Sequence, residues 1–253
     1  MMPINKGEFI SLNYTCKVKE SGEVADTTLE EVAKQAGLHK HEGEHTHEHV
    51  YEPLLVIVGE GWVPRGVDES LIGMETSEKK SVEISPEKGY GARDPSKVKL
   101  LPLRKFTKEG VNPVPGLQIE IDRKPALIRS VGAGRVQVDF NHPLAGKILL
   151  YDLTVEKIFT EDTDKIRAII HRRIPTLNLE KTMIKLSQNT VTSELPEEAF
   201  FIEGLQLLKR YIAEDLQKYL PKVKTVEFVE RFKKAEAPAS TEPKSASTPQ
   251  DKK

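Results

Sequence analysis

Five histidines lie close together in the first fifth of the chain. They are His39, His41, His45, His47 and His49, with Glu42, Glu44 and Glu48 among them. Imidazole and carboxylate groups at this density can bind nickel, zinc or copper. In an extended segment the spacing of two puts His45, His47 and His49 on one side. The alternative is a flexible polar loop between Asp26 and the strand after Pro53, which binds metal only adventitiously.

The bulk composition limits the classes of function. The 253 residues contain 38 Lys and Arg against 39 Asp and Glu, a net charge of −1, so no bulk positive field attracts a nucleic acid. Cys16 is the single cysteine, which excludes an internal disulfide and gives no sign of an oxidising compartment. Residues 1–6 lack an apolar signal core, and no apolar run reaches membrane-spanning length. We therefore expect a cytoplasmic protein with no nucleic-acid or membrane partner.

Apolar patterns predict the elements that must position a site. Several stretches alternate with a period of two or form a continuous apolar run, as strands do. Val67, Leu71 and Met74 recur at helical spacing after Gly66, which predicts one short helix. Many strands around one short helix indicate a curved antiparallel sheet and an α+β fold. The strands are expected at residues 10–18, 54–58, 81–85 and 149–155.

Changes in composition and apolar pattern along the sequence divide the chain into units. Between residues 93 and 140, three prolines fall close together and an alternating stretch follows a glycine-rich turn, which indicates a small β-rich subdomain inserted into the parent sheet. The last nineteen residues contain no aromatic residue and no Val, Ile or Leu, so we expect them to be disordered. The expected units are residues 1–92 with 141–160, the insert 93–140, a C-terminal α+β unit 161–234 and the tail 235–253.

The C-terminal unit is expected to contain two helices, a hairpin and a last strand. One helix stops near Pro175, and a longer one runs from near Pro196 to before Pro221. About seventy residues with one long amphipathic helix make a thin core. We therefore expect this unit to dock on a partner, for which a second copy of the chain, in a homodimer, is a candidate. The hairpin arms and the last strand are expected at residues 182–186, 191–195 and 223–229.

Five short motifs follow one another in a defined order. They are Asn13-Tyr14-Thr15, Gly22-Glu23-Val24-Ala25-Asp26, Val58-Gly59-Glu60-Gly61 with Gly66, the stretch from Ser85 to Gly91, and the stretch from Asn141 to Lys147 leading into Leu150-Tyr151-Asp152. Together they resemble the FKBP-type peptidyl-prolyl cis/trans isomerases, and the fifth resembles the SlyD-like branch. This resemblance implies that the insert is a flap domain that binds unfolded chains. The C-terminal unit resembles the extension of long archaeal members.

The resemblance also implies a proline pocket, with two departures from the family pattern. Ala25 stands where an aromatic residue is common. Pro64 has no N–H at a position whose backbone commonly donates to a substrate or macrolide carbonyl. Either that hydrogen bond is absent or the register shifts by one residue, so we expect weaker macrolide binding. The implied pocket residues are Tyr14, Asp26, Leu54, Val63, Pro64, Val67, Tyr90 and Tyr151.

Isomerisation of an X–Pro bond breaks no covalent bond, so it requires no cofactor. A dry apolar pocket disfavours the planar, more dipolar amide, and Asp26 would act electrostatically near the twisted carbonyl. The expected partners are unfolded or proline-containing polypeptides. Without the motifs, Tyr14 would be ordinary core, and Asp26 and Tyr90 ordinary turn residues. Leu100, Leu101, Leu103, Phe106, Ile128 and Val131 are candidate client contacts, although most of them would also suit the core of the insert.

Two other classes of function stay open at this level. One is a pure chaperone whose isomerase pocket is impaired by Ala25 and Pro64. The other is a metal-delivery protein that uses the histidine cluster for nickel or zinc.

Overall fold

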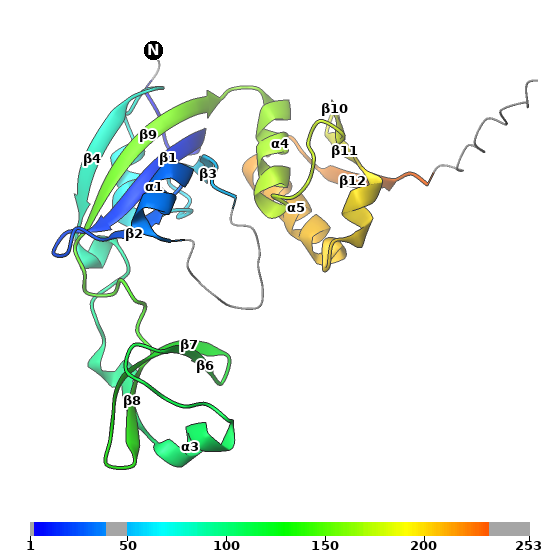
Figure 1. Cartoon of the computed structure of the whole chain (residues 1–253). Coiled ribbons are helices and arrows are strands. Elements are labelled where there is room, and N and C mark those ends of the chain that lie inside the picture. The colour runs from blue at the N-terminus through cyan, green and yellow to red at the C-terminus, as the bar shows by residue number, and fades with distance from the viewer. Residues whose placement is uncertain (1–2, 39–49, 233–253) are drawn as a thin grey trace, which may run out of the picture.

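The computed structural model describes residues 3–38 and 50–232, and its first unit is a five-stranded antiparallel sheet, the main sheet (Figure 1). Its strand order is β2-β1-β9-β4, and β3 pairs with the first half of β1. The prediction of an α+β fold with a curved antiparallel sheet is confirmed. The elements of this unit are β1 (Phe9–Val18), β2 (Val24–Thr27), α1 (Glu30–Ala36), β3 (Leu54–Ile57), α2 (Arg65–Leu71), β4 (Lys79–Ile84), η1 (Pro86–Lys88) and β9 (Leu149–Phe159).

One face of the main sheet carries the core of the first unit. Ile10, Leu12 and Cys16 point to this face from β1 and are fully buried. Helix α2 covers the face with Val67 and Leu71. The alternation that predicts β1 is therefore the alternation between the two faces of the sheet.

Helix α1 is not indicated by the sequence. The flexible polar loop between Asp26 and Pro53, which was the alternative interpretation of the histidine cluster, does not apply to these seven residues because they are helical. Only Ala33 of this helix is buried, so no apolar period marks it, and Gly37 ends it in the left-handed region at φ 69°. The histidine cluster and the tail 235–253 lie outside the described residues.

The insert forms a second antiparallel sheet with the order β5-β8-β7-β6, below the main sheet in Figure 1. Phe106 and Ile128 are buried in its core, whereas Leu100 and Val131 are exposed. The alternating stretch that follows the glycine-rich turn is β8, but the short helix α3 is not predicted by any apolar period. The elements are η2 (Pro95–Lys97), β5 (Val98–Pro102), α3 (Leu103–Lys108), β6 (Gln118–Ile121), β7 (Lys124–Gly132) and β8 (Arg135–Asp139).

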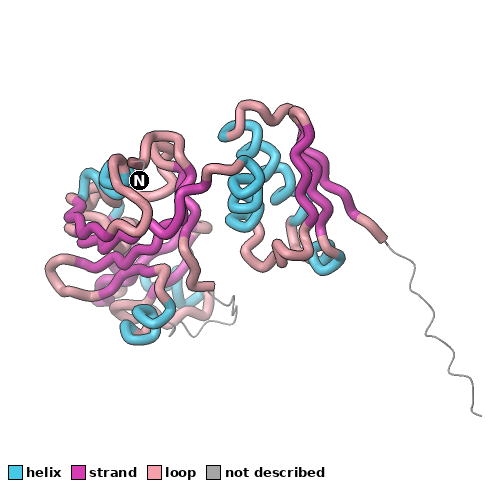
Figure 2. The backbone as a smooth tube through the Cα atoms, turned by 90° about the horizontal axis from the view of Figure 1, so that it is seen from above, coloured by secondary structure: helices cyan, strands magenta, loops and turns pink. Residues whose placement is uncertain are grey.

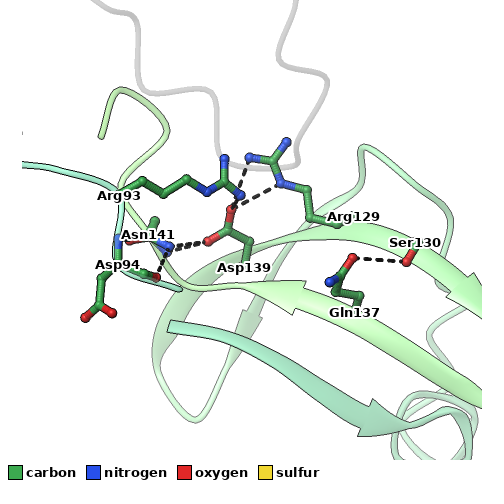
Figure 3. A network of polar contacts seen from close by, with 7 residues as sticks. All are labelled: Arg93, Asp94, Arg129, Ser130, Gln137, Asp139 and Asn141. Carbon is green, nitrogen blue, oxygen red and sulfur yellow. Dashed lines mark hydrogen bonds and ion pairs between the residues drawn. The ribbon is translucent and has the colours of Figure 1, made fainter. Parts of the chain in front are cut away.

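A buried carboxylate ties together the two segments that connect the insert to the main sheet (Figure 3). Asp139 at the end of β8 pairs with both Arg93 and Arg129. Its Oδ1 accepts from the backbone N and the Nδ2 of Asn141, at 2.9 and 2.8 Å. Asn141 also exchanges two hydrogen bonds of 2.9 Å with the backbone of Asp94. One ionic network therefore holds the entry and exit segments of the insert side by side.

The C-terminal unit places two helices against a three-stranded sheet with the order β10-β11-β12. The long helix begins at Leu205, so the expected start near Pro196 is wrong. A separate 3-10 turn, η3, comes first, and Gly204 at φ 72° stands between the two. The elements are α4 (Asp162–Arg173), β10 (Met183–Ser187), β11 (Thr190–Leu195), η3 (Glu197–Phe201), α5 (Leu205–Tyr219) and β12 (Thr225–Glu230), with β12 parallel to β11.

The two helices of the C-terminal unit share a core with β1 and β3 on the other face of the main sheet. Figure 2 shows the helices on the side of the C-terminal unit that faces the first unit. Phe9, Leu55 and Ile57 from these strands belong to the same core as Ile166 and Ile170 of α4. The thin core predicted for this unit is therefore completed by the first unit of the same chain.

Candidate active site

A short hydrogen bond joins two of the expected pocket residues across neighbouring strands. Tyr14 lies on β1 and Asp26 on β2, and the Tyr14 hydroxyl donates to Asp26 Oδ2 at 2.6 Å. Burial, followed by the hydrogen bond to Asp26, raises the pKa of Tyr14 far above its ordinary value. The phenol therefore keeps its proton and holds the carboxylate in one orientation.

Tyr151 lies next to Tyr14 on the same face of the sheet. Its strand β9 pairs with β1, and the two rings are 5.9 Å apart at 46°. Burial, together with the neighbouring Cys16 and Tyr90 groups, raises the pKa of Tyr151 far above its ordinary value. Burial also raises the pKa of Tyr90. Tyr14, Tyr90 and Tyr151, hereafter the tyrosine cluster, thus form protonated aromatic walls with polar tips.

Tyr90 is held by a turn and by a stacked histidine. Gly91, at φ 80°, donates its N–H to the carbonyl of Pro86 at 2.7 Å, which closes the turn after η1. The rings of Tyr90 and His142 stack with centroids 4.1 Å apart and planes within 3°. His142 Nδ1 accepts from the N–H of Leu144 at 3.2 Å, and burial lowers the pKa of His142. A neutral ring therefore stacks on Tyr90.

The aliphatic side of the site is built by α2 and the loop before it. Val67 is buried in the core that Tyr14 and Tyr151 line, and Val63 packs against the same core. The buried carboxylate of Asp68 accepts from the N–H groups of Gly59 and Gly61, at 2.7 and 3.2 Å, and so fixes this loop. The predicted residue Leu54, at the start of β3, is half-buried against this core as well.

Pro64 begins α2 and is half-buried. Its carbonyl accepts from the N–H groups of Val67 and Asp68 at 2.9 and 3.0 Å, so it acts as the N-cap of the helix. Its backbone has no N–H to offer a ligand. The structure thus brings the predicted residues to one core, with Asp26 bonded to that core and Pro64 at its border.

Two neighbours of the site were not predicted. Trp62 is the only tryptophan of the chain and stands directly before Val63, which is the signal that could have found it. Its Nε1 donates to the Tyr219 hydroxyl of α5 at 3.0 Å, and the guanidinium of Arg172 from α4 lies 4.4 Å from its ring. His142 is the second neighbour, and the motif around it gave no sign that it stacks on Tyr90.

Two cavities flank the tyrosine cluster. The first, about 710 Å³, begins at Tyr14 and Asp26 and continues along α4; it is hereafter the side cavity. The second, about 820 Å³, lies between His142 and strands β6 and β7 of the insert, hereafter the insert cavity. Both fall in the size range of ligand sites, roughly 300–1,000 Å³.

Neither a metal site nor a membrane span is found in the described ranges. Within residues 3–38 and 50–232, no group of three or more His, Cys, Asp or Glu side chains is arranged to hold a metal ion. No helix in the same ranges is long and apolar enough to cross a membrane. Because the histidine cluster is outside these ranges, metal binding there stays a prediction.

Comparisons with known proteins match each of the three units of the chain. The family profile described as FKBP-type peptidyl-prolyl cis-trans isomerase matches residues 2–105, the profile "FKBP26, IF domain" matches 99–144, and "FKBP26_C-terminal" matches 162–233. A short-type peptidyl-prolyl cis-trans isomerase of Methanocaldococcus jannaschii is 39% identical over 155 residues, 61% of this chain and 94% of that protein. The FKBP-type peptidyl-prolyl cis-trans isomerase SlyD of Aeromonas hydrophila is 28% identical over 151 residues, which are 59% of this chain and 61% of the length of that protein.

Proposed function

This chain belongs to the FKBP-type peptidyl-prolyl cis-trans isomerases, enzymes that interconvert the two forms of the peptide bond before proline, and we propose that the tyrosine cluster is its proline pocket. The observation that supports this most is the approach of Tyr14, Tyr151 and Asp26 to one another from three strands, with a 2.6 Å hydrogen bond and a 5.9 Å ring contact.

The pocket would act on the resonance of the amide. The barrier to rotation is about 18–20 kcal/mol, and each ~1.4 kcal/mol removed from it gives about a tenfold rate. A planar amide is more dipolar than its twisted transition state, so walls that exclude water disfavour the planar form. The carboxylate of Asp26, already oriented by Tyr14, would stabilise the carbonyl carbon of the twisted amide.

Alanine variants test the pocket. In a protease-coupled assay on a short proline peptide, Tyr90→Ala and Asp26→Ala are expected to lower kcat/KM by about tenfold or more, because each loses a wall or a charge that acts on the transition state. Tyr211→Ala on the exposed side of α5 is the matched control. Wild-type turnover in both pocket variants would overturn the assignment.

We further propose that the insert cavity holds unfolded client segments. Its walls include Ile119, Leu127, Phe140 and Pro143, and β6 is an edge strand with unpaired backbone groups on its outer side. The cavity reaches His142, which stacks on Tyr90, so a client bound there keeps its prolines near the pocket.

Aggregation suppression separates this surface from the pocket. Leu127→Ser is expected to weaken suppression of a refolding client while leaving turnover of a short proline peptide nearly unchanged. Val114→Ser, also in the insert but outside the cavity, is the control. Leu100→Ser tests the exposed face of β5 as the alternative client surface. Equal losses in both assays from Leu127→Ser would contradict this division.

The C-terminal unit is proposed to form a homodimer. Although its core is completed within the chain, it exposes Phe201 by 89%, Phe232 by 75%, and Met183 and Leu207 by 52% each. Large apolar side chains this exposed favour burial against another surface. Sedimentation of the wild type and of Phe201→Ser tests this, and a wild type that stays monomeric at high concentration would refute it.

The histidine cluster remains a separate prediction. Isothermal titration with nickel and zinc, comparing the wild type with a variant in which all five histidines are alanine, tests it. Unchanged binding in that variant would end the metal-delivery hypothesis.

A further inference from the structure

The side cavity is walled on one side by the C-terminal unit. Arg167, Ala168, His171 and Arg172 of α4 line it, and their spacing of four residues puts them on one face of the helix. The lining also includes Tyr14 and Asp26. A ligand that fills this cavity would therefore contact both α4 and the strands that carry Tyr14 and Asp26.

Two guanidinium groups in this wall have no acidic partner among residues 3–38 and 50–232. Arg167 Nη1 donates to the carbonyl of Leu179 at 3.1 Å, and Arg172 Nη1 donates to that of Leu55 at 3.2 Å. In the described part of the chain, neither arginine lies within ion-pair distance of a carboxylate. Burial, followed by the neighbouring charge of Arg173, lowers the pKa of Arg172, although the charge of Asp215 acts in the opposite direction. Its direct hydrogen-bond partner among the described residues is a carbonyl oxygen.

The other charged side chains of the lining have their own contacts in the described part of the chain. Lys157 Nζ lies 2.7 Å from Asp164, and Glu52 lies 2.8 Å from His171 Nε2. Asp26 accepts from the neutral phenol of Tyr14 and keeps its negative charge. The guanidinium groups without a carboxylate partner among the described residues thus lie on α4, at Arg167 and Arg172, and the Asp26 carboxylate lies on β2.

We propose that the side cavity is a substrate subsite that binds an acidic side chain, Asp or Glu, a few residues from the isomerised proline. Guanidinium groups bind carboxylates through paired, charge-assisted hydrogen bonds, and these bonds are stronger in a water-poor wall. The cavity volume of about 710 Å³ accommodates a short extended segment. The inference rests on the proposed pocket, because Tyr14 and Asp26 border both sites.

The position of α4 is fixed well enough for such recognition. Ile166, Ile169 and Ile170 are completely buried, and they share a core with Phe9 and Leu55 of the main sheet. A wall held by a packed core keeps its polar groups in place, which limits the loss of side-chain freedom on binding.

Peptide series in the full-length protein test the proposal. Short proline peptides carry Glu, Gln or Lys at each position within four residues of the proline. At low salt the wild type is expected to prefer Glu over Gln by about threefold to tenfold in kcat/KM at one or more positions, a preference that declines as salt screens the pair.

Charge reversal on α4 gives the sharper comparison. Arg167→Glu should shift the preference at that position from Glu to Lys, whereas Arg167→Lys should keep much of the preference for Glu. Arg104→Glu, on the exposed side of α3, is the matched control and should leave the preference unchanged. Arg167 is the better choice for this test. Arg172 also stacks on Trp62, so a substitution of Arg172 would disturb packing as well as charge.

The outcomes separate the subsite from the pocket. No preference for Glu over Gln in the wild type, or the same preference in the wild type and a folded Arg167→Glu, would overturn the subsite. Should Arg167→Glu not fold, loss of the Glu preference in Arg167→Gln supports the subsite and its retention overturns it. The pocket is tested separately by Tyr90→Ala, which should reduce turnover of the Glu, Gln and Lys peptides alike, whereas the subsite is tested by the ratio of Glu to Gln turnover within each variant.

Discussion

Replacing Asp139 with Asn is expected to loosen the insert without unfolding the main sheet. Asn has nearly the same shape and keeps one carbonyl acceptor for the two hydrogen bonds from Asn141. It loses the negative charge and turns an NH₂ group toward Arg93 and Arg129, which pair with Oδ2 in the wild type. The variant therefore removes the ionic part of the network shown in Figure 3.

The magnitude follows from the exposure of the partners. Arg93 and Arg129 are 44% and 41% exposed, so water compensates much of their loss, and each pair is worth only about 0.5–1 kcal/mol. The Asp139 side chain is 3% exposed, and each hydrogen bond from Asn141 weakens by roughly 1 kcal/mol when its acceptor becomes neutral. The opening free energy of the insert should fall by about 3–4 kcal/mol.

Hydrogen exchange measures this opening locally. Amides of β5 and β8 should exchange roughly 150-fold to 900-fold faster in Asp139→Asn, while those of β1 and β9 keep their protection. Asp122→Asn in the same insert is the control, since Asp122 is 79% exposed and meets Lys105 only at 3.4 Å. Unchanged exchange in β5 and β8, or equal acceleration in the main sheet, would refute the role of the network.

The same carboxyl gives a pH dependence with a defined sign. Burial alone would raise the pKa of Asp139, but the hydrogen bonds from Asn141 and the charges of Arg129 and Arg93 outweigh it and hold the pKa below its ordinary value. The folded insert thus binds this proton less readily than the unfolded chain, whose Asp pKa is about 3.9. The stabilisation is present above that value and is lost as the pH falls through the lower folded value. In Asp139→Asn, the opening free energy of the insert should depend less on pH in this acidic range.

Three further substitutions test the site and its surroundings. Gly66→Ala would place a Cβ 2.8 Å from Ile84 Cδ1, so thermal unfolding should show a loss of about 1–3 kcal/mol. Trp62→Ala removes a ring that packs against two cores, so the free energy of unfolding in denaturant should fall by about 3–5 kcal/mol. Trp62→Phe keeps an aromatic ring there and should lower the free energy of unfolding much less. Tyr14→Phe removes the donor to Asp26 and should lower kcat/KM on a proline peptide by roughly threefold to tenfold, with unchanged turnover speaking against an oriented carboxylate.

Strand β9 illustrates where the sequence pattern is informative and where it stops. Its alternation predicts a strand that ends at Val155, yet the strand continues to Phe159. The register with β1 shifts between Ser11 and Leu12, so that Glu156 is an extra residue on β9. After this bulge, the side chains of β9 alternate with the opposite phase. A search for a period of two therefore misses the last part of the strand.

Helical predictions fail for a different reason. Phe201 fits the apolar face of a helix that starts near Pro196, but it is 89% exposed. The break at Gly204, which takes a left-handed conformation, separates Phe201 from α5. The apolar period of a sequence does not show whether a given apolar residue is buried in the fold. Phe201 fitted the period although it is exposed, and the predicted helix therefore began too early.

The candidate site was predictable where its residues lie in short motifs. Tyr14, Asp26 and Tyr90 were selected by motifs in a fixed order, and the structure brings them to one core. The contacts of Trp62 with Arg172 and Tyr219 join residues that are more than one hundred positions apart. No local pattern encodes such a contact, because it depends on how two separately folded faces meet.

Strand β1 connects the site to the C-terminal unit because its two faces contact different parts of the molecule. Tyr14 and Leu12 point toward the core of the first unit, whereas Phe9 on the other face belongs to the core shared with α4. A strand is stiff over this short distance, and its alternation fixes the two faces relative to each other. Displacement of α4 would therefore be transmitted to the strand that carries Tyr14. The C-terminal unit thus packs on the strand that carries Tyr14 of the proposed proline pocket, and it also lines the side cavity.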